Sequence, residues 1–339
     1  KEESKLTKQK EEIIDLKGQT VMPGLIDAHC HISFDEPVSN DELFFHRREG
    51  LASIIAGTNA LKVLQSGVTS FFDADSLYSV GVDLRDAIES GIIPGPRMAV
   101  GGNALITSAG GTAGRLIPDE GKRGYGAVVT SRDEIVLEIR RQIKMGVDWI
   151  KIHVTGMVPR QEYEGELQAW SRDELKLACD TAHELGIPVV GHCRGGPSLK
   201  DAMSAGMDMI LHGTYMDEEG LELMVEKNIP LVPTFTFQAN LIDYAEEMNA
   251  SKDYKTIFEK EIDHLQAGEY WRPYSVDIMV MLPVWYFYEY DDSYTLEVEV
   301  WDGDNPETSD PFVVQRDIIL EDEEWEHIVL PSNAATTSP

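Results

Sequence analysis

Short apolar runs alternate with longer amphipathic stretches along residues 20–270 of this chain. The apolar runs have the length and the β-branched content of strands, whereas the stretches between them repeat apolar residues at helical spacing. The expected strands are Val21–His31, Val68–Asp73, Arg97–Gly102, Trp149–Val154, Pro188–His192, Met209–His212 and Pro230–Pro233. The expected helices are Ala52–Gln65, Ser131–Met145, Ser171–Leu185, Asp217–Lys227 and Asp253–Gln266.

Boundary signals support this alternation. Two expected helices open with Ser-Arg-Asp-Glu, at Ser131 and Ser171, where serine and glutamate can form a capping box. Glycines that permit a positive φ mark the ends of helices, at Gly67, Gly146, Gly186 and Gly206.

Alternating strands and helices predict a parallel sheet with right-handed crossovers. Seven strand–helix units in about 250 residues favour an α/β fold of the (β/α)8 TIM-like barrel type, incomplete at strand eight. A doubly wound sheet is the alternative, but no Gly-x-Gly-x-x-Gly run follows the first strand.

Charge changes the picture of possible partners. The 339 residues include 29 basic and 60 acidic side chains, a net charge of −31. Such a chain repels nucleic acid and anionic membranes, so we expect neither as a partner, and expect a small-molecule substrate instead. Three cysteines and an N-terminus without an apolar signal stretch predict a cytoplasmic protein. A homo-oligomer is left open.

Two histidines stand at the end of the first expected strand, in Asp27-Ala-His29-Cys-His31. Residues i and i+2 of a strand face the same side, so His29 and His31 point together into the barrel and Cys30 points away. Paired imidazoles are common ligands of a divalent metal. The alternative is a pair of histidines on an exposed loop.

A lysine lies in another apolar strand, in Trp149-Ile-Lys151-Ile-His153. An exposed charge is one interpretation of Lys151. A lysine that points inward is desolvated, its neutral amine is favoured, and carbon dioxide can convert it to a carbamate able to bridge two metal ions. His153 shares that face as a further ligand or a substrate contact.

Two more histidines, His192 and His212, end apolar strands, and the carboxyl ends of strands form the functional face of a barrel. Arg194, just past one of them, is a candidate for binding an acidic substrate group, or a structural loop arginine. Four strand-end histidines and a lysine in barrel order predict a shared metal site.

The run Val21-Met-Pro-Gly-Leu-Ile-Asp-Ala-His-Cys-His31, followed by Lys151, His192 and His212, resembles the metal-dependent amidohydrolase superfamily. Segments 149–156 and 164–171 look closest to its binuclear branch with a carboxylated lysine, which includes Xaa-Pro dipeptidase-like enzymes and hydrolases of phenylureas and thiocarbamates. The resemblance covers roughly residues 15–268.

This resemblance implies two divalent metal ions, with zinc expected and manganese or cobalt as alternatives. His29 and His31 would hold the more buried metal. The carbamate of Lys151 would bridge to a second metal held by His192 and His212. The resemblance also implies that residues 1–19 are a remnant of an N-terminal β-sandwich and that residues 20–268 form the hydrolase barrel.

The chain departs from the family pattern in two places that bear on function. The family places an aspartate at the end of strand eight, as metal ligand and proton shuttle, and no matching run follows residue 233. Thr112 stands where prolidase-like members often carry a histidine, which weakens any transfer of dipeptide specificity.

Composition changes again after residue 268. Residues 271–339 hold two basic and 16 acidic side chains, so 269–330 is expected to be a separate acidic, β-rich segment and 331–339 a disordered tail. Thr295–Trp301, Phe312–Val314 and Ile318–Leu320 are the strand candidates there.

Together these residues predict hydrolysis of an amide-like carbon–nitrogen bond (amide, urea, carbamate or dipeptide) by a metal-bridging hydroxide. One alternative is a mononuclear deaminase of the same superfamily that uses the histidines without Lys151. The other is a metal-binding barrel without activity, because the strand-eight aspartate is not found.

Overall fold

The computed structural model describes residues 23–34, 43, 46–112, 125–157 and 166–234, together with the backbone of two strands further along the chain. The strands before residue 235 are β1 (Leu25–Cys30), β2 (Val68–Asp73), β3 (Arg97–Val100), β4 (Ala104–Thr107), β5 (Gly126–Val129), β6 (Ile150–His153), β7 (Thr155–Met157), β8 (Leu167–Gln168), β9 (Val189–Cys193), β10 (Met209–His212) and β11 (Leu231–Val232). The helices are α1 (Glu49–Gln65), α2 (Val80–Glu89), α3 (Arg132–Met145), α4 (Arg172–His183), α5 (Gly196–Ala205) and α6 (Glu218–Lys227).

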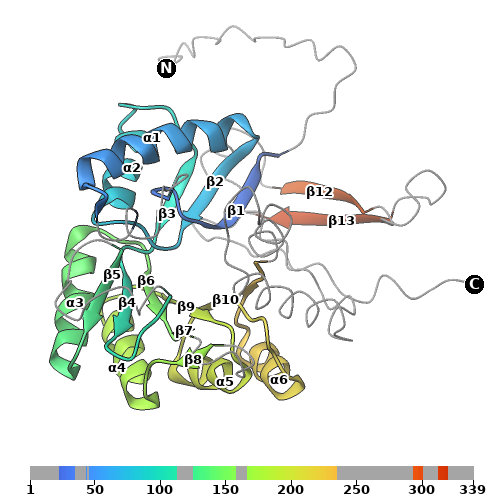
Figure 1. The fold of residues 1–339 in the computed structure, drawn as a ribbon. Coiled ribbons are helices and arrows are strands. Elements are labelled where there is room, and N and C mark those ends of the chain that lie inside the picture. The colour runs from blue at the N-terminus through green and yellow to red at the C-terminus, as the bar shows by residue number, and fades with distance from the viewer. Residues whose placement is uncertain are drawn as a thin grey trace, which may run out of the picture.

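Each of the seven expected strands is present, with ends that differ by a few residues at most of them. They pair in chain order and in parallel, as β1-β2-β3 in one sheet and as β6-β9-β10-β11 in another. Figure 1 shows α1 and α2 beside the first sheet, and α3 to α6 on the outer side of the second. The α/β class with parallel sheets is therefore confirmed.

The described residues do not close into a barrel, because β3 and β6 form no ladder. After β3 the chain makes β4 and β5, two strands that the sequence did not predict, and β4 pairs with the edge of β6. The carbonyl of Val100 still accepts hydrogen bonds from the amides of Asp148 (2.9 Å) and Trp149 (3.1 Å). The two sheets also meet through side chains, since Phe72 of β2 packs against Trp149 and against a cluster that includes Val190.

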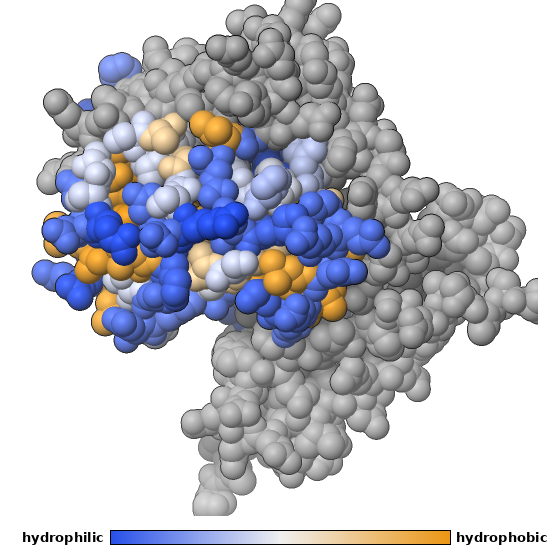
Figure 2. Space-filling model, turned by 90° about the horizontal axis from the view of Figure 1, so that it is seen from below, coloured by the Kyte–Doolittle hydropathy of each residue, from blue (hydrophilic) through white to orange (hydrophobic). Residues whose placement is uncertain are grey.

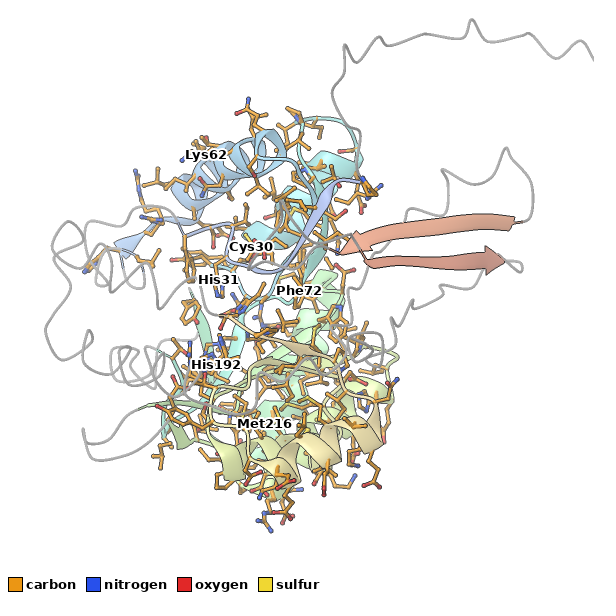
Figure 3. All side chains as sticks on the ribbon, turned by 90° about the vertical axis from the view of Figure 1, so that its right-hand side faces the viewer. Cys30, His31, Lys62, Phe72, His192 and Met216 are labelled. Carbon is orange, nitrogen blue, oxygen red and sulfur yellow. The ribbon has the colours of Figure 1, made fainter. Side chains whose placement is uncertain are left out.

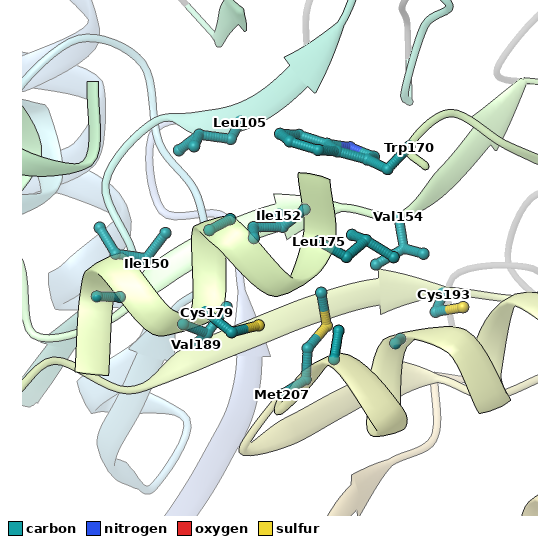
Figure 4. Close-up of a cluster of buried hydrophobic side chains, with 14 of the residues drawn as sticks. Leu105, Ile150, Ile152, Val154, Trp170, Leu175, Cys179, Val189, Cys193 and Met207 are labelled. Carbon is teal, nitrogen blue, oxygen red and sulfur yellow. The ribbon is translucent and has the colours of Figure 1, made fainter. Parts of the chain in front are cut away.

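The largest apolar core lies between the second sheet and its helices (Figure 4). On α4 the buried positions Leu175, Ala178, Cys179 and Ala182 follow the i, i+3, i+4, i+7 spacing of one helix face. That face covers Ile152 and neighbouring strand residues, and all of these side chains are fully buried. The opposite, outer face of the helices is largely hydrophilic, with scattered apolar side chains (Figure 2).

The predicted serine caps and helix-end glycines are found in the structure. Ser171 forms the complete capping box with Glu174, while Ser131 caps Glu134 N and the Glu134 carboxylate instead accepts from the Thr130 amide. The four predicted helix-end glycines all have positive φ. Helices α2 and α5 were not among the helices named from the sequence, although apolar residues recur at i, i+3 and i+4 in both, as at Leu199, Ala202 and Met203.

The acidic segment contains two antiparallel strands, β12 (Ser293–Val300) and β13 (Phe312–Ile319). The second is continuous where two short strands were expected. The expected helix Asp253–Gln266 and the proposed segments 1–19 and 331–339 lie outside the described residues.

Candidate metal centre

The loops that follow β1 and β2 are tied together by hydrogen bonds between residues distant in sequence. The amide of Ile32 donates to Asp73 Oδ1 over 3.1 Å. Asn59, buried in α1, donates through Nδ2 to the carbonyl of Ile32 over 3.0 Å. These bonds hold the loop after β1 against the end of β2, and so place Asp75 beside His31.

Five histidine rings from β1, β6, β9 and β10 form a chain of neighbours in the interior. Successive ring centroids lie 5.0 Å apart for His31 and His29, 5.0 Å for His29 and His212, 4.3 Å for His212 and His192, and 4.9 Å for His192 and His153. Figure 3 places His31 and His192 between the two sheets. The structure therefore brings together all the histidines that the sequence singled out.

Asp75 joins the two ends of this chain of rings. Its carboxylate, fully buried, lies 3.2 Å from His31 Nδ1, 3.5 Å from Lys151 Nζ and 3.2 Å from His153 Nε2. Burial by itself would raise the pKa of Asp75, but the His31 imidazole and the Lys151 ammonium lower that pKa well below its usual range. The carboxylate is therefore a negative charge at neutral pH, in the middle of the histidines.

Several polar atoms of this cluster have no hydrogen-bond partner although they are buried. They are His29 Nε2, His212 Nε2 and both carboxylate oxygens of Asp75. Burial also lowers the pKa of both histidines well below the usual value, which keeps the rings neutral with a free lone pair. Buried polar atoms without partners are rare, and neutral imidazoles are the form that ligates metals.

Three side chains of this cluster lie close enough together to bind one metal ion. His29, His31 and Asp75 each offer a ligand atom, and these atoms lie within 4.8 Å of one another. No other group of three or more metal-ligating side chains in the described part of the chain has this closeness. The donor set of imidazoles and carboxylate suits zinc, manganese or cobalt, so the residues present fit a divalent metal.

His212 has an unusual backbone. It has a φ of 78°, in the left-handed region that only a few per cent of non-glycine residues adopt. Such a conformation costs on the order of 1–3 kcal/mol and persists where the surroundings impose it. Its Nδ1 contacts Thr234 Oγ1, which leaves Nε2 directed toward the other rings.

A buried glutamate supports His192. Glu166 Oε2 accepts a hydrogen bond from His192 Nε2 over 2.7 Å and one from Thr155 Oγ1 over 2.7 Å, and Glu166 Oε1 lies 3.6 Å from Arg194 Nε. Burial alone would raise the pKa of Glu166, but these neighbours lower it to about 2. Carboxylates that accept from a ligand histidine fix its orientation, and here they leave Nδ1 of His192 for a metal.

Arg194 lies inside the protein rather than at its surface. Its guanidinium contacts Glu166 and donates to Thr214 Oγ1 over 3.4 Å, and only 5% of the residue is exposed. These contacts agree with the structural role that the sequence left open for it. Its role in substrate binding stays a prediction.

Lys151 is 1% exposed, so its interpretation as an exposed strand charge is wrong. Burial lowers its pKa, while the nearby Asp75 carboxylate raises it, and the net direction is downward. On the same strand, His153 accepts a hydrogen bond at Nδ1 from the amide of Thr112 over 3.2 Å. The hydroxyl of Tyr125 lies 3.4 Å from its Nε2.

Sequence reasoning missed three residues of this site: Asp75, Glu166 and Tyr125. The pattern Asp73-Ala-Asp75 directly follows an apolar strand, so the strand-end rule that found the histidines also applied to it. Glu166 lies in segment 164–171, which carried the family resemblance, but no pattern marked it as a site residue, and none marks Tyr125. The strand-eight aspartate expected from the family resemblance has no counterpart in the described part of the chain before residue 235.

Comparisons with known proteins agree with this geometry. Residues 20–267 match the amidohydrolase family. The chain is 31% identical to ochratoxinase from Aspergillus niger over 235 residues, which are 63% of this chain and 47% of that protein. It thus spans about half of the length of this curated relative. Within the described ranges, no helix combines the length and apolarity needed to cross a membrane.

Solved structures place it in the expected branch. A prolidase complexed with N-methylphosphonate-L-proline superposes with a TM-score of 0.65 at 26% identity, covering 76% of this chain and 65% of that one. A Xaa-Pro dipeptidase with methionine bound in its active site gives 0.61 at 27% identity, covering 72% and 62%. The expected likeness to Xaa-Pro dipeptidases is confirmed. The family match covers well over half of this chain, and proteins of that family generally use divalent metals. This chain therefore belongs to the amidohydrolase family.

Proposed function

We propose that the chain is a metal-dependent hydrolase of an amide-like carbon–nitrogen bond. The observation that carries this proposal is the convergence of four imidazoles and Lys151 on one buried point, where His29 Nε2 and His212 Nε2 have no hydrogen-bond partner. Purely structural histidines would have such partners. A bound metal ion would be coordinated by the lone pairs of these two nitrogens.

We assign the metal ligands according to the strands that carry them. His29 and His31 would hold one divalent metal, and His192 and His212 a second, with Lys151 as a carbamate between them. Bound there, the metal supplies Lewis-acid activation of the scissile carbonyl and of the attacking water. The chain contributes a largely dry site, because Lys151, His192 and His212 are buried, while His29 and His31 are only partly exposed.

Two buried carboxylates determine where protons are held. Glu166 keeps the proton of His192 on Nε2, so this ring has one protonation state in the cycle. Asp75 Oδ1 lies 3.2 Å from His31 Nδ1, which puts this carboxylate beside the histidines at the end of β1. We assign it the role of accepting a proton from water and returning it to the leaving amine.

The relatives support the class of bond. The chain is similar to a prolidase, a Xaa-Pro dipeptidase and ochratoxinase. The amide bond to a C-terminal amino acid is therefore the first substrate type to test. Thr112 contacts His192, at 3.3 Å between Oγ1 and Nε2, and it stands where prolidase-like members often carry a histidine. We therefore propose the class of bond and leave dipeptide specificity open.

The experiment uses purified protein reconstituted with zinc, manganese or cobalt and a panel of N-acyl amino acids, dipeptides, carbamates and aryl ureas. We expect turnover of at least one class, abolished by His192→Ala. His183→Ala is the matched control, because His183 lies on the exposed side of α4 and pairs with Asp208. Loaded protein without turnover of any class would favour the inactive metal-binding barrel.

Lys151 separates the binuclear proposal from the mononuclear deaminase. If Lys151 is a carbamate, Lys151→Ala loses one metal equivalent and nearly all activity, Lys151→Glu retains part of both, and reconstitution without bicarbonate lowers activity. One observation favours the alternative: the amine already lies 3.5 Å from the Asp75 carboxylate, which can hold it as an ammonium. One metal equivalent in both wild type and Lys151→Ala would establish the mononuclear site.

A further inference from the structure

We propose that the carboxylate of Asp75 is a direct metal ligand beside His29 and His31, in the place of a strand-eight aspartate, and that His153 is the residue that positions it. This inference rests on the metal centre of the proposed function. It concerns which residues hold the metal, so it can fail while the hydrolase proposal stands.

The buried carboxylate of Asp75 needs donors or positive charge beside it. The side chain has no exposure; Oδ2 faces His153 Nε2 at 3.2 Å, and Oδ1 lies 3.2 Å from His31 Nδ1, which is also 2.9 Å from the Asp75 carbonyl. A carboxylate taken out of water without compensation is very costly, so buried carboxylates are paired or coordinate metals. Lys151 Nζ, at 3.5 Å from Oδ1, is the rival partner. It contacts one oxygen only, and it leaves the lone pair of His29 Nε2 without an explanation.

Asp75 also prepares a neighbouring ligand. Its backbone carbonyl lies 2.9 Å from His31 Nδ1, and a carbonyl can only accept, so the proton of this ring is on Nδ1. The lone pair of His31 is therefore on Nε2, the atom left free for a metal. Metal-bound histidines generally donate their other N–H to a carbonyl or carboxylate in this way.

His153 has the opposite tautomer. The amide of Thr112 donates to its Nδ1 over 3.2 Å, and an amide N–H can only donate, so the ring proton is on Nε2. That Nε2–H faces Asp75 Oδ2 at 3.2 Å. His153 consequently has no lone pair to offer toward the cluster. The geometry assigns it to orient the carboxylate, rather than to bind metal or substrate.

The loop that fixes this tautomer has no freedom to move away. A side chain at Gly156 would meet Thr112 N at 2.1 Å, so the two backbones are in direct contact. Gly156 has a φ of 158°, at the edge of the range that favours glycine. The strand β7, which follows closely after His153, thus packs against the donor that sets the proton of His153.

The test measures zinc affinity in chelator-treated protein by competition with a chromophoric chelator, and records the visible spectrum of the cobalt form. Asp75→Asn should weaken zinc binding by more than about a hundredfold and alter the cobalt bands, because an anionic carboxylate ligand is replaced by a neutral amide. His153→Leu should weaken binding by about 10- to 100-fold with cobalt bands of wild-type shape. His153→Gln, which can donate from Nε2, should recover most of that loss.

Asp208→Asn is the matched control, since Asp208 also pairs with a histidine, His183, and accepts from a strand amide, that of Val189, but lies outside the cluster. It should leave zinc affinity within a few-fold of wild type. Affinity and cobalt spectrum of Asp75→Asn equal to wild type would overturn the proposal. If that variant does not fold, a zinc-bound crystal structure of wild type decides: we expect an Asp75 oxygen at about 2.0–2.2 Å from zinc. Zinc bound by histidines with Asp75 outside bonding distance would refute the assignment.

Discussion

Glu166→Gln tests whether stability and metal binding depend on the negative charge of the Glu166 carboxylate, which is hydrogen-bonded to His192, or only on the size of this side chain. The substitution keeps the size of the side chain and one carbonyl oxygen, but it removes the negative charge. In the structure that charge faces His192 Nε2 at 2.7 Å and Arg194 Nε at 3.6 Å. The three side chains are only 7–13% exposed, so water screens these interactions weakly.

The magnitude follows from that burial. Removing one partner of a buried ion pair costs about 3–5 kcal/mol, because the other charge stays desolvated. One oxygen remains to accept from Thr155 or His192, so we expect the lower end, about 3 kcal/mol of unfolding free energy. Loss of the orienting carboxylate should also weaken metal binding by about 10- to 100-fold.

The assay is urea unfolding with chelator present, which isolates stability from metal binding, followed by zinc titration of the folded variant. Asp180→Asn is the control: Asp180 pairs with Lys176 on the surface of α4, where the two side chains are 49% and 64% exposed. That pair should contribute at most about 1 kcal/mol. If Glu166→Gln costs no more than this control and binds zinc like wild type, the charge of Glu166 has no role at the site.

Three further predictions can be checked by denaturation. Chelator should lower the melting temperature and added zinc should restore it, because a metal that binds only the folded state stabilises it, and His29→Ala should remove the difference. Leu175→Ala, at a fully buried position of α4, should cost about 2–5 kcal/mol in urea unfolding, while Leu137→Ala, at a 68% exposed position of α3, should cost far less. Ser171→Ala should cost about 1 kcal/mol, since it removes a complete capping box, and an unchanged urea midpoint would contradict that role.

Much of the site could be inferred from local pattern. The period of a strand puts His29 and His31 on one side, and their rings are indeed neighbours. His192 and His212 were found because the carboxyl ends of parallel strands meet at one edge, a rule that needs only the order of the elements. The serine caps and the helix-end glycines depend on four or five consecutive residues, which the sequence displays directly.

What the sequence alone could not determine involves groups far apart along the chain. Asp75 follows β2 and Lys151 lies in β6, in two different sheets whose side chains meet in the interior, and no periodicity encodes their contact. The protons of His31 and His153 depend on single donors and acceptors from other loops. The insertion of β4 beside β6, which keeps the described strands from closing into a barrel, is likewise a choice between competing edges. Such choices are decided by long-range packing and hydrogen bonding, and therefore only by the tertiary structure.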